Sequence, residues 1–83
     1  MHYRIEQMAE LNILVQYSLD TIKGIKVHST ASEEKINAVE RLYEKGLVTQ
    51  VDGGYLTDLG LKAAEHAQAL VLMLANHDQN IAS

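Results

Sequence analysis

The stretch GLVTQVDGGYLTDLG, residues 46–60, decides the fold, because it combines a helix end, a tight turn and a helix start. A glycine readily takes the left-handed backbone conformation that closes a helix, so Gly46 predicts the end of one. Asp52-Gly53 is a strong signal for the tight turn of a β-hairpin, since such turns favour glycine and aspartate. The stretch therefore predicts a β-hairpin over 47–57 that follows directly on a helix.

A further helix is predicted after the hairpin, over about 58–76. Thr57 offers its hydroxyl as the N-cap, Asp58 lies where the helix dipole favours a carboxylate, and Gly60 permits close packing. The apolar residues of this helix fall on two opposite faces, which predicts two packing partners. One face carries Leu59, Ala63, Ala67, Leu70 and Leu74, and the other carries Leu61, Ala64, Val71 and Leu72. The sequence leaves the order of residues 76–83 open.

Two helices are predicted before the hairpin, over about 3–23 and about 31–45. Gly24 is placed to end the first, and the pattern from Thr30 to Glu33 matches a capping box that begins the second. The alternating residues 25–28 fit either a short strand or an extended linker. The inward face of the first helix is predicted to be Ile5, Met8, Ala9, Leu11, Val15, Leu19 and Ile22, and that of the second Ile36, Val39, Leu42 and Tyr43.

The composition is that of one small globular domain, residues 1–83. Apolar residues make up 47% of the chain and charged residues 22%, which is ordinary for a folded protein. There is no cysteine, which excludes disulfides, thiolate metal sites and cysteine nucleophiles. We therefore expect an α+β domain, mainly α, of three helices with one β-hairpin.

The charge balance argues against a protein that finds nucleic acid by bulk electrostatics. Seven basic residues against eleven acidic ones give a net charge of −4. The longest apolar run, Ala69–Ala75, is too short to span a bilayer, and the N-terminal residues are polar. We therefore expect a cytoplasmic protein without a membrane partner.

The sequence gives little sign of catalytic, cofactor or metal chemistry. Among the histidines, only His66 and His77 share a predicted helix face, and at about 1.5 Å rise per residue they lie roughly 16 Å apart. Gly53-Gly54 is followed by no lysine, so it does not match a phosphate-binding loop. We therefore expect no catalytic residues, no cofactor and no metal site, and predict that the protein is not an enzyme.

The order of helix, extended segment, helix, hairpin and helix resembles the winged-helix architecture of bacterial transcription regulators over roughly residues 33–67. The whole chain, with GIKVH at 24–28, DGGYLTDLG at 52–60 and AAEHAQAL at 63–70, is also similar to a family of small bacterial proteins of unknown function. Members of that family are sometimes labelled DNA-binding. The resemblance thus implies a winged-helix-like regulator.

The chain departs from the winged-helix pattern at the surfaces that would meet DNA. The segment between Val27 and Gly46 holds one helix but hardly a full helix-turn-helix, and the predicted hairpin carries no Lys or Arg. Only four cations are candidates for contact with nucleic acid, and we expect that contact to be weak. These candidate contacts are Lys23, Lys26, Arg41 and Lys45.

Surplus apolar surface predicts a homodimer instead, since exposed apolar patches usually mark interfaces. The candidate interface residues are Ile13, Leu14, Tyr17, Leu61, Ala64, Val71 and Leu72. Alternatively, the first helix lies across the second face of the third and leaves no patch. The leading hypothesis is a non-enzymatic regulatory module that acts on an unknown protein partner as a homodimer; the alternative is a DNA-binding transcriptional regulator.

Overall fold

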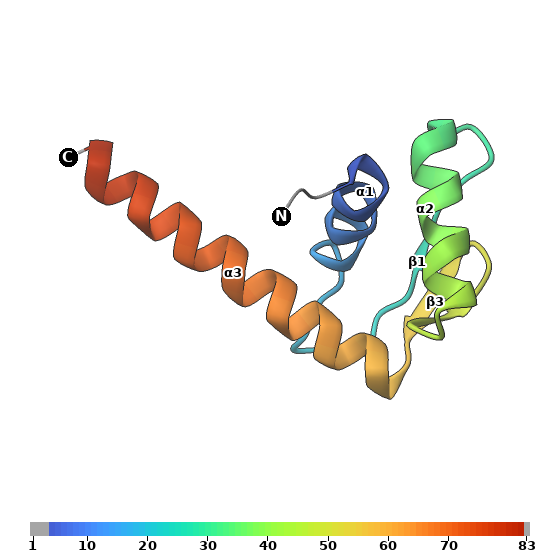
Figure 1. Cartoon of the computed structure of the whole chain (residues 1–83). Coiled ribbons are helices and arrows are strands. Elements are labelled where there is room, and N and C mark those ends of the chain that lie inside the picture. Colours follow the sequence, from blue (N-terminus) through green and yellow to red (C-terminus); the bar gives the residue numbers. More distant parts are fainter. Residues whose placement is uncertain (1–3, 83) are drawn as a thin grey trace.

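The computed structural model describes the backbone of residues 4–82 and the side chains of residues 4–75. Three helices and a small antiparallel sheet make up this part of the chain, which confirms the predicted mainly helical α+β class (Figure 1). The elements in order are α1 (Ile5–Leu14), β1 (Ile25–Lys26), α2 (Glu33–Glu44), β2 (Val48–Gln50), β3 (Gly53–Leu56) and α3 (Asp58–Ala82). The predicted start of the first helix at Tyr3 and the predicted end of the domain at Ser83 lie outside the described residues.

The sheet has the strand order β1-β3-β2, so the hairpin folds back on the segment that precedes α2. β1 pairs antiparallel with β3, with Ile25 opposite Gly54 and Lys26 opposite Gly53. Of the two possibilities that the sequence left open for residues 25–28, the strand is therefore right.

The hairpin is present, but its turn differs from the predicted one. The turn lies at Val51 and Asp52, and the positive φ angles fall on Gly53 (125°) and Gly54 (69°). The pairing register of β2 and β3 shifts between Val48 and Gln50, and the two glycines accommodate this irregularity. Gly53 also lets β1 approach, because a Cβ there would lie 2.7 Å from the carbonyl oxygen of Ile25.

The two ends of the stretch 46–60 meet at a junction where α2 ends and α3 begins. Gly46 has a φ of 79° and closes α2 as predicted. The Thr57 hydroxyl donates to the Gly46 carbonyl at 2.6 Å and accepts from the Gly60 amide at 3.0 Å, so it caps α3 as predicted. The Thr57 amide donates to the Leu47 carbonyl at 3.1 Å. The junction thereby ties both helices and both hairpin strands together.

Gly60 is the tightest point of this junction. A Cβ built on Gly60 would lie 1.8 Å from the Leu47 carbonyl oxygen, closer than any non-bonded contact. Only a residue without a side chain lets the first turn of α3 pass over the start of β2. Gly60 therefore fixes the path by which α3 leaves the hairpin.

The core is one cluster that α1, α2, the sheet and the first half of α3 share. Ile13, Val39 and Leu42 are its largest fully buried side chains. The remaining buried apolar residues are Ala9, Leu14, Tyr17, Val27, Ala38, Val48, Ala64 and Ala67. The predicted inward residues Ile36, Val39 and Leu42 of α2 do pack there, whereas Tyr43 is exposed and Ala38 takes the core position.

The first helix is shorter than predicted and ends at Leu14, not at Lys23. The side-chain amide of Gln68, on α3, donates to the carbonyl of Leu14 at 3.3 Å and to that of Tyr17 at 2.7 Å. A continuing helix would use those carbonyls for its own amides, so the contact from α3 replaces the next turn. Gly24 consequently ends no helix and instead lies beside β3, where a Cβ would come within 3.0 Å of the Gly54 carbonyl oxygen.

The predicted inward face of the first helix was also largely wrong. Ile13 and Leu14 are buried, and with Ala9 they form the face that packs against the rest of the chain. Most residues of the predicted stripe lie at the surface because the shortened helix presents a different side to the core. The exposed ones are Ile5, Met8, Leu11, Leu19 and Ile22.

A buried carboxylate fastens α1 to α2. Glu10 has a side chain only 9% exposed, and it pairs with Arg41 at 3.1 Å and with Lys45. Arg41 also donates to the carbonyl of Glu6 at 3.2 Å. The N-cap of α2 is Ser32, which accepts from the Lys35 amide at 3.2 Å, and not the predicted Thr30.

The third helix extends to Ala82, beyond the predicted end near residue 76. Its first half packs on the core through small residues, among them Ala64 and Ala67. Beyond Gln68 it projects away from the rest of the molecule (Figure 1). The five apolar residues that follow Ala69 are all exposed.

Gly60→Ala is expected to lower the free energy of unfolding by more than about 2 kcal/mol, because the added methyl group meets a backbone carbonyl that has no freedom to retreat. Leu59→Ala, at the exposed neighbouring position, is the control and should cost less than about 1 kcal/mol. Urea denaturation followed by circular dichroism measures both. Equal losses in the two variants would show that the contact at Leu47 does not constrain the fold.

Tyr17 predicts a loss of stability at alkaline pH. Its hydroxyl donates to the Gly54 carbonyl at 3.0 Å, and burial raises the pKa of Tyr17 from 10.0 to about 12. Because the pKa is higher in the folded state, the neutral hydroxyl contributes stability below pH 10.0 that disappears as the pH rises toward about 12.

Tyr17→Phe should therefore lower the free energy of unfolding at neutral pH by about 1 kcal/mol, the value of one hydrogen bond. The difference between the wild type and this variant should shrink as the pH rises above about 10. Denaturation curves of both proteins at neutral pH and at about pH 11 test this. A difference that stays constant with pH would contradict it, since the two proteins differ only in the hydroxyl of residue 17.

Candidate functional site

The four cations predicted to touch nucleic acid separate into two pairs. Arg41 and Lys45 lie on α2, and both are engaged by the Glu10 carboxylate of α1. Both cations share this one carboxylate, so a phosphate group would compete with a buried partner for either of them. Arg41 and Lys45 therefore have a structural role that the sequence alone did not reveal.

The other two cations lie on the segment that leads into the sheet. Lys23 and Lys26 are both exposed, and Lys26 is in β1 opposite Gly53 of the hairpin. Among the hairpin residues, Thr49, Gln50, Val51 and Tyr55 are exposed, and all of them are uncharged. Lys23 and Lys26 thus have no basic neighbour in the hairpin with which to form a larger patch.

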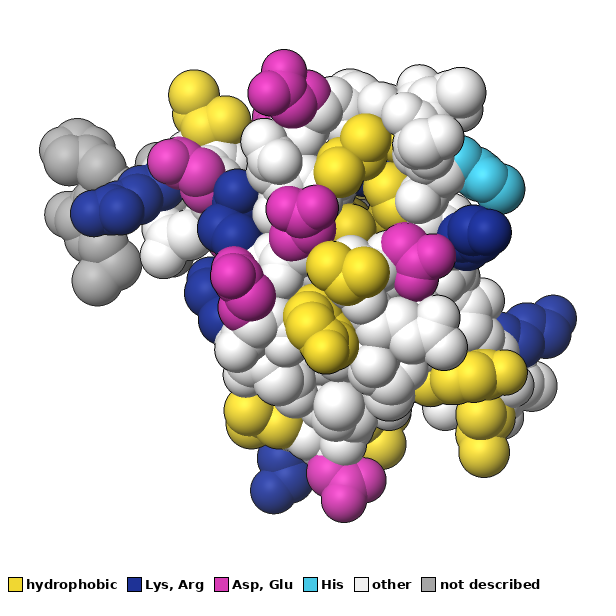
Figure 2. Space-filling view, turned by 90° about the vertical axis from the view of Figure 1, so that its right-hand side faces the viewer, with side chains coloured by type: hydrophobic (Ala, Val, Ile, Leu, Met, Phe, Trp, Pro, Cys, Tyr) yellow, Lys and Arg dark blue, Asp and Glu magenta, His cyan; other side chains and the backbone are white. Residues whose placement is uncertain are grey.

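The outer surface of α2 is acidic. Its exposed charged residues are Glu33, Glu34, Glu40 and Glu44. Figure 2 looks onto this side of the molecule: acidic and hydrophobic side chains occupy the middle of the face, and Lys and Arg side chains lie around its rim. A helix with this surface would repel the phosphates that line a DNA groove.

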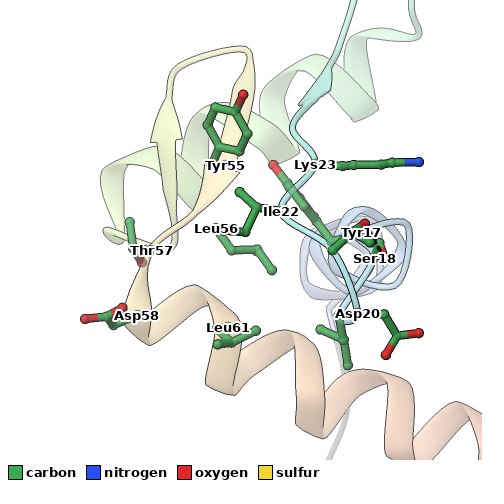
Figure 3. A pocket seen from close by; sticks show the side chains of 12 residues that line it. Tyr17, Ser18, Asp20, Ile22, Lys23, Tyr55, Leu56, Thr57, Asp58 and Leu61 are labelled. Carbon is green, nitrogen blue, oxygen red and sulfur yellow. Dashed lines mark hydrogen bonds between the residues drawn. The ribbon is translucent and has the colours of Figure 1, made fainter.

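A hollow of about 210 Å³ lies between the segment 17–23, the end of the hairpin and the start of α3. Tyr17 crosses it toward the hairpin, and Ile22 lies among Tyr55 and Leu56 (Figure 3). The charged side chains at its edge do not converge, since Lys23 and Asp58 point away from it in opposite directions (Figure 3). Such a site has neither the polar focus nor the enclosure that small-molecule recognition needs.

Metal chemistry finds no support within the described residues. No group of three His, Asp or Glu side chains there comes together as metal ligands. His2 and His77 lie outside the side chains that the structure describes. In the same part of the chain, no helix combines the length and the hydropathy needed to cross a membrane.

The predicted dimer interface is partly wrong. Ile13, Leu14, Tyr17 and Ala64 are buried in the core of the single chain, so they offer no surface to a partner. Three helices do cover them, because α1 turns Ile13 and Leu14 toward the core, where Tyr17 and Ala64 also pack. The other three predicted residues, Leu61, Val71 and Leu72, are exposed.

Five consecutive apolar residues of α3, Leu70–Leu74, are exposed and are called the apolar segment below. Every side chain in it is exposed, from 51% at Val71 to 67% at Met73. Successive helical residues point about 100° apart, so five apolar residues in a row cover the whole circumference. Leu70, Met73 and Leu74 were missed as interface candidates, although the unbroken apolar run from Ala69 to Ala75 was a visible signal.

Comparison with known proteins places the chain in a family. No significant match was found among curated proteins or among solved structures. Residues 1–75 match the model of a family of unknown function, and the matched region includes the whole apolar segment. The chain therefore belongs to the family of unknown function DUF5669.

Proposed function

We propose that this protein is a small non-enzymatic regulatory module that acts through protein–protein contacts as a homodimer. The observation that carries the proposal is the apolar segment, Leu70–Leu74, which projects from the body and is exposed on all sides. A helix that is hydrophobic around its whole circumference is normally buried. Its exposure in the single chain therefore favours a state in which a second chain covers it.

The energetics support association. Covering an apolar side chain that is about half exposed contributes on the order of 1 kcal/mol. The segment holds five such side chains in each copy, and a symmetric contact covers those that face the partner in both copies. The burial of these side chains would therefore favour the dimer over two separate chains.

A winged-helix-like architecture fits this proposal. In chain order α2 follows β1 and precedes β2, and β3 of the hairpin pairs with β1. This arrangement is consistent with the resemblance to bacterial regulators. The surfaces that would read DNA in such a module are acidic on α2 and without Lys or Arg on the hairpin. We infer a cytoplasmic regulator that keeps the shape of a DNA-binding domain and uses it for protein contacts.

DNA binding is the second candidate, and one observation favours it. Lys23 and Lys26 are exposed next to the hairpin, and in a dimer two such pairs would contribute. Against it stand the acidic face of α2 and the pairing of Arg41 and Lys45 with Glu10. Four exposed lysines per dimer would give only a weak contact that salt disrupts.

The homodimer is tested by placing charges on the apolar segment. The purified wild type is expected to have the mass of two chains by light scattering, and the double variant Leu72→Glu/Met73→Glu the mass of one, because four carboxylates would be buried without partners. Gln50→Glu, an exposed position on the hairpin, adds charge elsewhere and should leave the dimer intact. A wild type that remains a monomer at high concentration would contradict the homodimer.

The DNA alternative is tested by fluorescence anisotropy with random duplex DNA. We expect no binding at low salt, or binding that is the same in Lys23→Glu/Lys26→Glu as in the wild type. If the alternative is right, the affinity of the wild type should fall about 100-fold between roughly 50 and 200 mM salt, as three or four phosphate contacts require. The charge-reversal variant would then lose it entirely.

A further inference from the structure

We propose that the hollow between the segment 17–23, the end of the hairpin and the start of α3 is a docking site for an extended, basic segment of a partner protein. That segment pairs with the backbone of β3 at Leu56 and places one large apolar side chain in the hollow. The inference rests on the proposed role in protein–protein contacts and names where a partner other than a second copy binds. The hollow is called the hairpin hollow below.

The sheet has an open backbone edge beside the hairpin hollow. β1 consists only of Ile25 and Lys26, and Ile25 lies opposite Gly54 of β3. The next residues on the same side of this ladder, two further along each strand, are Lys23 and Leu56. No backbone hydrogen bond joins Lys23 to Leu56, so the ladder stops where the hollow begins.

The backbone of Leu56 faces this opening. The amides of its two neighbours point to the other edge of β3. Tyr55 donates to the Thr49 hydroxyl at 2.9 Å. Thr57 donates to the Leu47 carbonyl at 3.1 Å. Because successive amides of a strand point to opposite edges, the Leu56 amide points away from β2, toward the side on which β1 pairs. An extended peptide that adds a strand here can exchange hydrogen bonds with Leu56.

The wall of the hollow opposite β3 is the segment 18–24 (Figure 3). Within the described chain, the backbone of these seven residues makes no hydrogen bond to another backbone group. All seven residues are exposed, and Ile22 at the rim is 91% exposed. This wall can therefore shift to admit a strand without the loss of a backbone hydrogen bond.

The inside of the hollow is apolar and has room for one large side chain. Its volume of about 210 Å³ exceeds the roughly 150 Å³ of a cavity that holds a benzene ring. The Tyr17 hydroxyl, which crosses the hollow, already donates to the Gly54 carbonyl. A leucine, methionine or phenylalanine side chain thus fits, and it would cover apolar surface that is now exposed. The exposed apolar residues of the lining are Leu19, Ile22, Tyr55 and Leu61.

The charges at the rim favour a basic partner. Asp20, Lys23 and Asp58 line the edge of the hollow, and no ion pair joins any of them to another described side chain. Two carboxylates and one ammonium group leave the rim with one net negative charge, and the whole chain has a net charge of −4. Cations beside the apolar side chain of the partner complement this rim. A second copy would bring the same negative charge, so it is the poorer occupant.

The test uses blocked five-residue peptides and the whole chain labelled with ¹⁵N for nuclear magnetic resonance. The peptide acetyl-Lys-Thr-Leu-Thr-Lys-amide has threonines that favour an extended backbone, a leucine for the hollow and lysines for the acidic rim. It should shift the amide signals of Lys23, Leu56 and Leu61. It should also bind about tenfold more tightly than the same peptide with a central alanine. Methylation of the central backbone nitrogen, or glutamate in place of both lysines, should weaken binding.

Matched variants locate the contact. Ile22→Lys places a charge of the same sign as the peptide at the rim and should abolish binding, and the high exposure of residue 22 makes this change harmless to the fold. Val51→Lys adds the same charge at an exposed hairpin position outside the lining and should leave binding unchanged. The double variant Leu72→Glu/Met73→Glu should also bind normally, because the apolar segment takes no part in this site.

The outcomes separate this site from the proposed homodimer. Equal affinity for the leucine and alanine peptides, no shifts at millimolar peptide, or shifts that persist in Ile22→Lys would overturn the docking site. Signals of the hollow that shift with protein concentration alone would also overturn it, since a second copy would then be the occupant. Light scattering on the same sample reports the dimer independently, so a dimer that binds no peptide leaves the proposed function standing. A monomer that binds none would overturn both.

Discussion

The approach of Gly60 to the Leu47 carbonyl is the contact on which the arrangement of this molecule depends. It allows the first turn of α3 to pass directly over Leu47, the residue before β2, at a separation that excludes even one methyl group. The Thr57 hydroxyl then serves both helices, since it donates to the Gly46 carbonyl just beyond α2 and accepts from the Gly60 amide in the first turn of α3. Once these bonds form, the direction of α3 is fixed, and with it the side on which α1 packs and the part that projects.

The sequence predicted those features that neighbouring residues determine. The end of α2 at Gly46, the cap at Thr57 and the existence of the hairpin follow from backbone preferences over a few positions, and all three are confirmed. The end of α1 was wrong because a glutamine more than fifty residues further along the chain binds the carbonyls of Leu14 and Tyr17. Local patterns carry no information on such a contact.

The candidate surfaces were predicted less well, for a related reason. Residues Ile13 and Leu14 were assigned to an interface because the wrong side of the first helix was chosen as the core side. Arg41 and Lys45 were predicted to be available surface cations, whereas in the structure both pair with Glu10. By contrast, the apolar run in the second half of α3 is visible in the sequence, and only the exposure of all five residues from Leu70 to Leu74 required the structure.

The length of α3 has a consequence for how such a dimer would display its hairpins. The helix comprises 25 residues, so its axis is about 37 Å long, and each hairpin is attached at one end of it. A dimer joined through the apolar segment would be held together far from the hairpins, because the hairpin precedes the first turn of α3 and the segment lies in its second half. The proposed contact between copies and the hairpin surface would then be separate, so a substitution at one of them should leave the other unchanged.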